Sequence, residues 1–162
     1  MYTNSANLPF RKIYSIDFEY CGANGEIPKI VCMVTQDLRS GKVRRYWRDD
    51  LCKMKTPPFE TVEDVVLISY FAPAEVQSML ALGWASNVSV IDLFAEFRCQ
   101  TNGNPDVGRK SLVSALHFYG LKQFIPEEKD SMRNLILSGG PWSEAQRSAI
   151  LDYCQQDVIA LG

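Results

Sequence analysis

Residues 65–71, VVLISYF, form a continuous apolar run of the length typical of a strand that is buried on both faces of a sheet. The residues after this run predict a helix, because Pro73 suits a first helical turn and Gly83 ends the helix after Leu82. A buried strand that leads directly into a helix is typical of layered α/β folds.

The N-terminal part of the chain is rich in β-forming residues. Lys12–Tyr20 is apolar, rich in β-forming residues and alternates with period two, which predicts a strand that enters a core. Ile30–Val34 and Val43–Trp47 are predicted as the next strands, with a turn at Ser40-Gly41 and a linker at Lys53–Pro58. We therefore expect an antiparallel β-meander.

The remainder of the chain alternates strands and helices. The further predicted elements are a strand at 88–91, a helix at 92–98, a loop at 99–110 and helices at 111–119 and 127–137. Ser143 and Gln146 form a capping box for a last helix that we expect to run as far as Gly162. Together these elements predict an α/β fold with a mixed sheet.

Composition restricts the chemistry. The chain has 162 residues, of which 46% are hydrophobic, and this suits one domain. A single histidine argues against histidine-rich zinc sites, and five cysteines without a CxxC pair argue against a disulfide framework or a thiolate zinc site. The net charge of −2 differs from that of a typical nucleic-acid-binding domain. Any catalysis is therefore expected to depend on carboxylates.

The sequence contains no apolar run of about eighteen residues, and its polar N-terminus lacks the features of a signal peptide. We therefore expect a cytoplasmic protein that has no membrane partner.

Asp17 and Glu19 are two residues apart on the first predicted strand, so their side chains share one face, with Cα atoms roughly 6.5 to 7 Å apart. Two partly buried acids repel each other unless they are neutralised, and a divalent cation would neutralise them. The alternative is an exposed strand edge on which charged and apolar residues alternate.

Tyr153 and Asp157 are one turn apart on the last predicted helix. A phenol in this position could hold a water molecule beside a metal that the carboxylate binds. The alternative is a tyrosine at the edge of the core and a solvated aspartate. However, an aspartate near a helix C-terminus is disfavoured by the helix dipole, and cation binding would explain its presence.

The motifs IDFE at 16–19 and YCQQD at 153–157 resemble those of the DEDDy branch of the DnaQ-like 3′–5′ exonucleases. The chain looks most like the proofreading domain of phage-type family A DNA polymerases, with similar runs at 70–75 and 84–98. The resemblance covers residues 12–162. It implies an RNase H-like three-layer α/β fold, with 1–162 as a single exonuclease domain that is part of, or split from, a longer polymerase in a bacterial or phage-infected cell.

The resemblance also implies roles for individual residues. Asp17 and Glu19 would bind the metals, with Asp17 bridging both, and Asp157 would be a further metal ligand. Tyr153 would position the attacking water. In the histidine-type branch a histidine lies five residues before the last acid, whereas this chain has Asp152 there, which favours the tyrosine subtype.

Two residues compete for the second motif of the family. Glu75 follows the buried strand at the start of a helix, where relatives usually have an aspartate, and we prefer it as the outer ligand of the second metal. Asp92 ends the next strand and is the alternative catalytic acid. Asp92 can instead be the N-cap of the helix at 93–98.

Carboxylate ligands select hard cations, so we expect two Mg²⁺ or Mn²⁺ ions. Two such ions can activate water and stabilise an in-line displacement at phosphorus. The expected reaction is hydrolysis of the 3′-terminal phosphodiester of DNA, with release of nucleoside monophosphates.

The expected partners are a single-stranded 3′ end of DNA and a polymerase domain in cis or in trans; RNA is not excluded. Arg109 and Lys110, in the loop beyond the Asp92 strand, are candidate DNA contacts. Phe18 and Tyr20 could stack on terminal bases, although Phe18 alternates away from the acids and can equally pack in the core.

Two further hypotheses stay open. One is a weak or inactive exonuclease-like module that acts as a binding or scaffold part of a polymerase. The other is an exoribonuclease of the RNase D type, because recognition of the 2′-hydroxyl depends on the geometry of the pocket.

Overall fold

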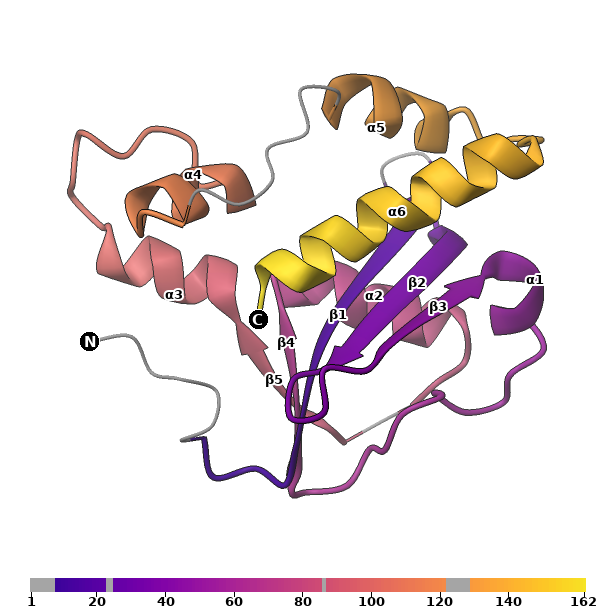
Figure 1. Cartoon of the computed structure of the whole chain (residues 1–162), viewed down its shortest axis with the longest axis horizontal. Helices are drawn as coiled ribbons and strands as arrows, with labels where there is room; N and C mark the ends of the chain where they lie inside the picture. The colour runs from indigo at the N-terminus through magenta and orange to yellow at the C-terminus, as the bar shows by residue number, and fades with distance from the viewer. Residues whose placement is uncertain (1–7, 23–24, 86, 122–128) are drawn as a thin grey trace.

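In the computed structural model, which describes residues 8–22, 25–85, 87–121 and 129–162, the chain folds around a five-stranded sheet of order β3-β2-β1-β4-β5 (Figure 1). The strands are β1 (Lys12–Cys21), β2 (Lys29–Asp37), β3 (Val43–Trp47), β4 (Val65–Ser69) and β5 (Ser89–Asp92). The β1–β2 and β2–β3 pairs are antiparallel, which confirms the predicted meander. The β1–β4 and β4–β5 pairs are parallel, so the sheet is mixed.

Helices cover both faces of the sheet, which confirms the predicted three-layer α/β fold (Figure 1). They are α1 (Arg48–Leu51), α2 (Ala72–Ala81), α3 (Leu93–Gln100), α4 (Leu112–Phe118), α5 (Lys129–Leu137) and α6 (Glu144–Ala160). In the part of the chain that the structure describes, none of these helices combines the length and the apolar character needed to span a bilayer.

Several elements differ from the predictions. Strand β2 runs from Lys29 to Asp37 and is longer than the predicted Ile30–Val34. The short helix α1 was not predicted, because four residues carry too little periodicity to be recognised. Strand β4 ends at Ser69 rather than at Phe71, because Phe71 adopts a left-handed backbone with φ 90° before α2. Helix α6 ends at Ala160 and not at Gly162, with Leu161 as its C-cap. The predicted start of α5 at Glu127 lies outside the described residues.

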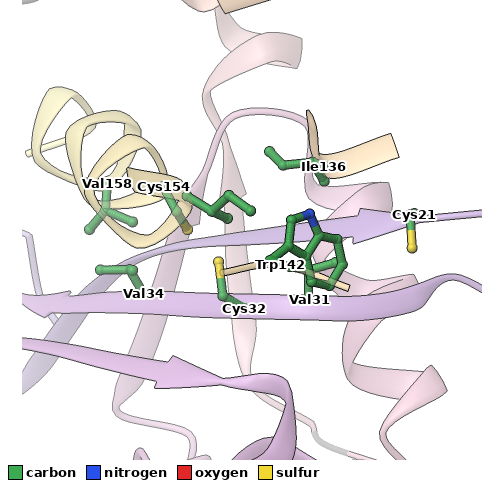
Figure 2. Packing of buried hydrophobic residues seen from close by; sticks show 9 residues of the cluster. Cys21, Val31, Cys32, Val34, Ile136, Trp142, Cys154 and Val158 are labelled. Atoms are coloured by element: carbon green, nitrogen blue, oxygen red, sulfur yellow. The ribbon is translucent and has the colours of Figure 1, made fainter. Parts of the chain in front are cut away.

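Helix α6 packs on the sheet through a cluster of buried side chains (Figure 2). Its capping box is present as predicted, with Ser143 accepting from the Gln146 N–H and Gln146 accepting from the Ser143 N–H. In Figure 2 the sulfur atoms of Cys154 on α6 and Cys32 on β2 face each other. A register shift beside Glu19 lets both Val31 and Cys32 face α6, which strict alternation would forbid.

Helix α2 covers the opposite face of the sheet. Ile16, Phe18, Leu67, Met79 and Trp84 are buried together there. Strand β4 is buried along its whole length, because helices cover both of its faces. The sheet therefore holds β1 between two hydrophobic layers, with its alternate side chains pointing to α2 and to α6.

Candidate active site

Strand β1 presents two acids toward α6. Asp17 is paired with Val34 and Glu19 with Cys32, and both partners belong to the cluster beneath α6. The Cys154 thiol donates to the backbone oxygen of Asp17 at 3.4 Å. One potential ligand atom from each of Asp17, Glu19 and Cys154 lies within 4.8 Å of the others. The prediction that both acids share one face is therefore confirmed.

Topology places Glu75 beside these acids. Ser15 pairs with Ile68 near the end of β4, so Asp17 lies just beyond that end, where the chain turns into α2. Parallel strands have their carboxyl ends at the same edge of a sheet, and α/β folds commonly bind ligands at this edge. Glu75, in the first turn of α2, is therefore directed toward the end of β1.

Glu75 is only 4% exposed, which is rare for a carboxylate. Its carboxylate accepts from the backbone N–H of Phe18, whereas its Oε2 is buried with no hydrogen-bond partner among the described residues. Burial, and then repulsion from Asp17 and Glu19, raise the pKa of Glu75 well above its usual range. Of the two candidates for the second motif, Glu75 is the one placed against both acids of β1.

Asp92 is instead the N-cap of α3. Its Oδ1 accepts from the backbone N–H groups of Phe94 at 3.0 Å and Ala95 at 3.3 Å. The same oxygen accepts from the Phe71 N–H at 3.1 Å. These bonds satisfy backbone N–H groups at the starts of α2 and α3. The capping role alone therefore explains an aspartate at this position, and no metal is needed to explain it.

Tyr153 and Asp157 lie one turn apart on α6, as predicted. Burial raises the pKa of the Tyr153 hydroxyl, with Asp157, then Glu19 and Asp17, adding to the effect. The phenol therefore lies within electrostatic reach of acids from both α6 and β1. Asp157 does not belong to the group of Asp17, Glu19 and Cys154, whose ligand atoms lie within 4.8 Å of one another. Asp157 and both acids of β1 nevertheless act on the same Tyr153 hydroxyl.

A cavity of about 400 Å³ opens beside these residues. Its polar lining comes from Glu19, Tyr20, Tyr70, Arg133 and Tyr153. Tyr20 lines this cavity, and its stacking on a terminal base stays a prediction. Arg133 was not predicted, because only the tertiary packing of α5 against β1 brings this exposed cation to the acids. The sequence offers one signal for it: Arg133 lies one helical turn before Ile136 and Leu137 and so shares a helix face with them. These two residues also line the cavity.

The other predicted substrate contacts have different positions. The Phe18 ring is 4% exposed and packs with Trp84 at 6.4 Å between centroids, so the stacking role predicted for it is wrong. Strand alternation turns this ring toward α2, away from the acids. The Lys110 ammonium donates to the Val107 carbonyl at 3.2 Å and stabilises its own loop. Arg109 is exposed, and it is not among the described residues that line the cavity.

The donor atoms at this site suit a hard divalent cation. Burial first, and then a hydrogen bond with Cys32, raise the pKa of the Cys154 thiol, so this sulfur remains a protonated donor. The remaining candidate ligands are carboxylate oxygens, and the buried Oε2 of Glu75 is available to a cation. Oxygen donors of this kind fit Mg²⁺ or Mn²⁺ better than softer metals.

Comparisons with known proteins support the fold. No family model matches the chain, and no curated protein matches its sequence. The EXO domain of Aedes aegypti Nibbler is similar in structure, with a TM-score of 0.52 and 10% identity over 96% of this chain and 80% of that chain. RNase D from Escherichia coli, an exoribonuclease involved in structured RNA processing, has a TM-score of 0.52 and 13% identity over 89% of this chain and 36% of its own. The chain therefore has the RNase H-like α/β fold found in these exonuclease domains, and it spans about a third of the length of RNase D.

Proposed function

We propose that the chain is a metal-dependent 3′–5′ exonuclease that hydrolyses the terminal phosphodiester of a single-stranded nucleic acid. The observation that carries this proposal is the burial of Glu75 against Asp17 and Glu19 at the carboxyl ends of β1 and β4. Buried acids of like charge destabilise a fold, and such an arrangement is typical of sites where cations and a phosphate bind. The fold shared with exonuclease domains supports the same activity.

Asp17, Glu19 and Asp157 would hold the metals, with Glu75 as the outer ligand of the second one. Two divalent cations bound there would activate the attacking water and offset the charge that develops at phosphorus. The carboxylates come from β1, α2 and α6, so their relative positions depend on the packing of both helices on the sheet.

In the reaction, the oxygen of a water molecule forms a bond to the terminal phosphorus, and the bond from phosphorus to the 3′ oxygen of the preceding nucleotide breaks. That 3′ oxygen takes up a proton, and the products are a nucleoside 5′-monophosphate and a chain one nucleotide shorter. The Tyr153 hydroxyl would orient the water. Arg133, at the wall of the cavity, would contact phosphate oxygens of the strand.

DNA is the first candidate substrate, in a proofreading role beside a polymerase, because the sequence motifs resemble those of polymerase proofreading domains. An RNA 3′ end is the second candidate, and the structural similarity to RNase D favours it. The two differ at the 2′-hydroxyl, so one experiment with both substrates separates them.

The test is incubation of 5′-labelled single-stranded and 3′-mismatched DNA, and of 5′-labelled RNA, with the chain in Mg²⁺ or Mn²⁺. We expect a ladder that shortens from the 3′ end and disappears with EDTA. The Asp17→Asn variant should be inactive, whereas Lys55→Gln, an exposed surface change, should behave like the unmodified chain. If neither DNA nor RNA is shortened in either metal, the exonuclease proposal fails; binding without shortening would then indicate an inactive module.

A further inference from the structure

Phe71 has two unfavourable properties at once. Its backbone has φ 90°, a left-handed conformation that a bulky side chain rarely adopts. Its ring is 45% exposed, so burial of the side chain does little to offset this conformation. Strain of this kind is characteristic of residues held in place for binding or catalysis.

The surrounding residues hold the Phe71 ring in a defined orientation. Asp92 accepts the Phe71 N–H, which fixes the backbone at the start of α2. The ring packs edge-on against Phe94, with 5.4 Å between centroids and an interplanar angle of 89°. The guanidinium of Arg98 lies 5.5 Å from the centroid of the Phe94 ring. An aromatic surface with an adjacent cation results.

This surface lines a cavity of about 480 Å³, to which Phe71, Phe94, Arg98 and Asn102 contribute. The cavity neighbours the candidate active site through Tyr70, whose ring packs on Phe94 at 5.8 Å and also lines the cavity beside Glu19. Phe71 is the N-cap of α2, and Glu75 is the fourth residue of that helix. A strand whose 3′ end lies at the acids therefore has a neighbouring nucleotide within reach of Phe71.

We propose that the cavity lined by Phe71, Phe94, Arg98 and Asn102 is a subsite for the nucleobase next to the 3′-terminal nucleotide of a single strand. The base stacks on the exposed Phe71 ring, and Arg98 and Asn102 offer a charge and an amide to the sugar-phosphate backbone beside it. Stacking tolerates every base, so this subsite holds the strand without selecting its sequence. The inference rests on the proposed function, because that function places the 3′ end at the acids.

The test uses single-stranded DNA and RNA oligonucleotides with a phosphorothioate 3′ linkage that resists hydrolysis. Each carries 2-aminopurine, whose fluorescence falls on stacking, either next to the 3′ terminus or ten nucleotides away. With the unmodified chain we expect quenching only at the position next to the terminus. Quenching with DNA alone, with RNA alone or with both supports the subsite and identifies the strand that it takes. Equal fluorescence at both positions with both oligonucleotides would overturn the proposal.

Phe71→Asn removes the ring and places a residue that tolerates the left-handed backbone, so this variant should fold and melt at an equal or higher temperature. We expect it to lose the quenching and to bind the oligonucleotide about 5- to 100-fold more weakly. Phe71→Tyr should restore both properties. Leu80→Asn, on the helix that Phe71 caps and 61% exposed, is the matched control and should bind normally. If Phe71→Asn binds and quenches as the unmodified chain does, the subsite does not exist.

Hydrolysis of an unmodified oligonucleotide and of the p-nitrophenyl ester of thymidine 5′-monophosphate separates this inference from the proposed function. The ester occupies only the terminal position. In Phe71→Asn, the ratio of kcat/KM for the oligonucleotide to kcat/KM for the ester should fall about 5- to 100-fold. If the unmodified chain hydrolyses both substrates and the ratio is the same in Phe71→Asn, the subsite alone is refuted. If the unmodified chain hydrolyses neither, the proposed function is refuted, and the position-specific quenching still decides the subsite.

Discussion

Glu75 combines 4% exposure with neighbours of the same charge, Asp17 and Glu19, and these conditions raise its pKa. A carboxylate in these surroundings is costly to the fold unless a cation compensates it. Its hydrogen bond from the Phe18 N–H offsets only part of this cost. Glu75 therefore reduces the stability of the chain, and under the proposed function it would provide a ligand for a metal.

We predict that Glu75→Gln stabilises the metal-free chain at neutral pH, by about 1 to 3 kcal/mol, because the amide removes a buried group that is repelled by two acids. We also expect Mn²⁺ to raise the melting temperature of the unmodified chain but not that of Glu75→Gln. Thermal unfolding in EDTA and in Mn²⁺ measures both effects. The control is Glu63→Gln, an exposed position, which should alter neither. A destabilised Glu75→Gln variant with an unchanged response to Mn²⁺ would contradict this role.

Most helices and strands follow from local sequence patterns, and the exceptions have physical causes. The meander and the buried strand β4 could be predicted because alternation and apolar runs are local signals. The position of Asp17 and Glu19 on one face follows from the same alternation. Arg133 could not be predicted, since its place depends on how α5 packs on the sheet. The left-handed backbone of Phe71 was also not predictable, because phenylalanine rarely adopts it.

Helix α3 depends on its cap, and this dependence distinguishes the two candidates for the second motif. Asp92→Ala removes an acceptor shared by three backbone N–H groups and should lower the free energy of unfolding by about 1 to 2 kcal/mol in urea. Asp92→Asn keeps a capping oxygen and should cost less than about 0.5 kcal/mol. If Asp92→Asn is folded but has lost metal-dependent hydrolysis, Asp92 rather than Glu75 is the second-motif acid.

In the whole molecule, the sheet brings together groups that lie far apart in the sequence. Helix α6 carries Tyr153 and Asp157 across β1, and the parallel β1–β4 pair brings the start of α2 to the same edge (Figure 1). Under the proposed function, the net charge of −2 does not conflict with a polyanionic substrate, because cations held by the acids would attract phosphate. Arg133 adds a positive charge at the cavity wall.

The most direct measurement is mass spectrometry of the products released from single-stranded DNA and RNA in ¹⁸O-enriched water with Mn²⁺. Attack of water on the terminal phosphorus predicts nucleoside 5′-monophosphates that each carry one ¹⁸O atom. These products should be absent in EDTA and with the Asp157→Asn variant. Failure of the unmodified chain to release mononucleotides, or release of nucleoside 3′-monophosphates, would contradict a metal-dependent 3′–5′ exonuclease.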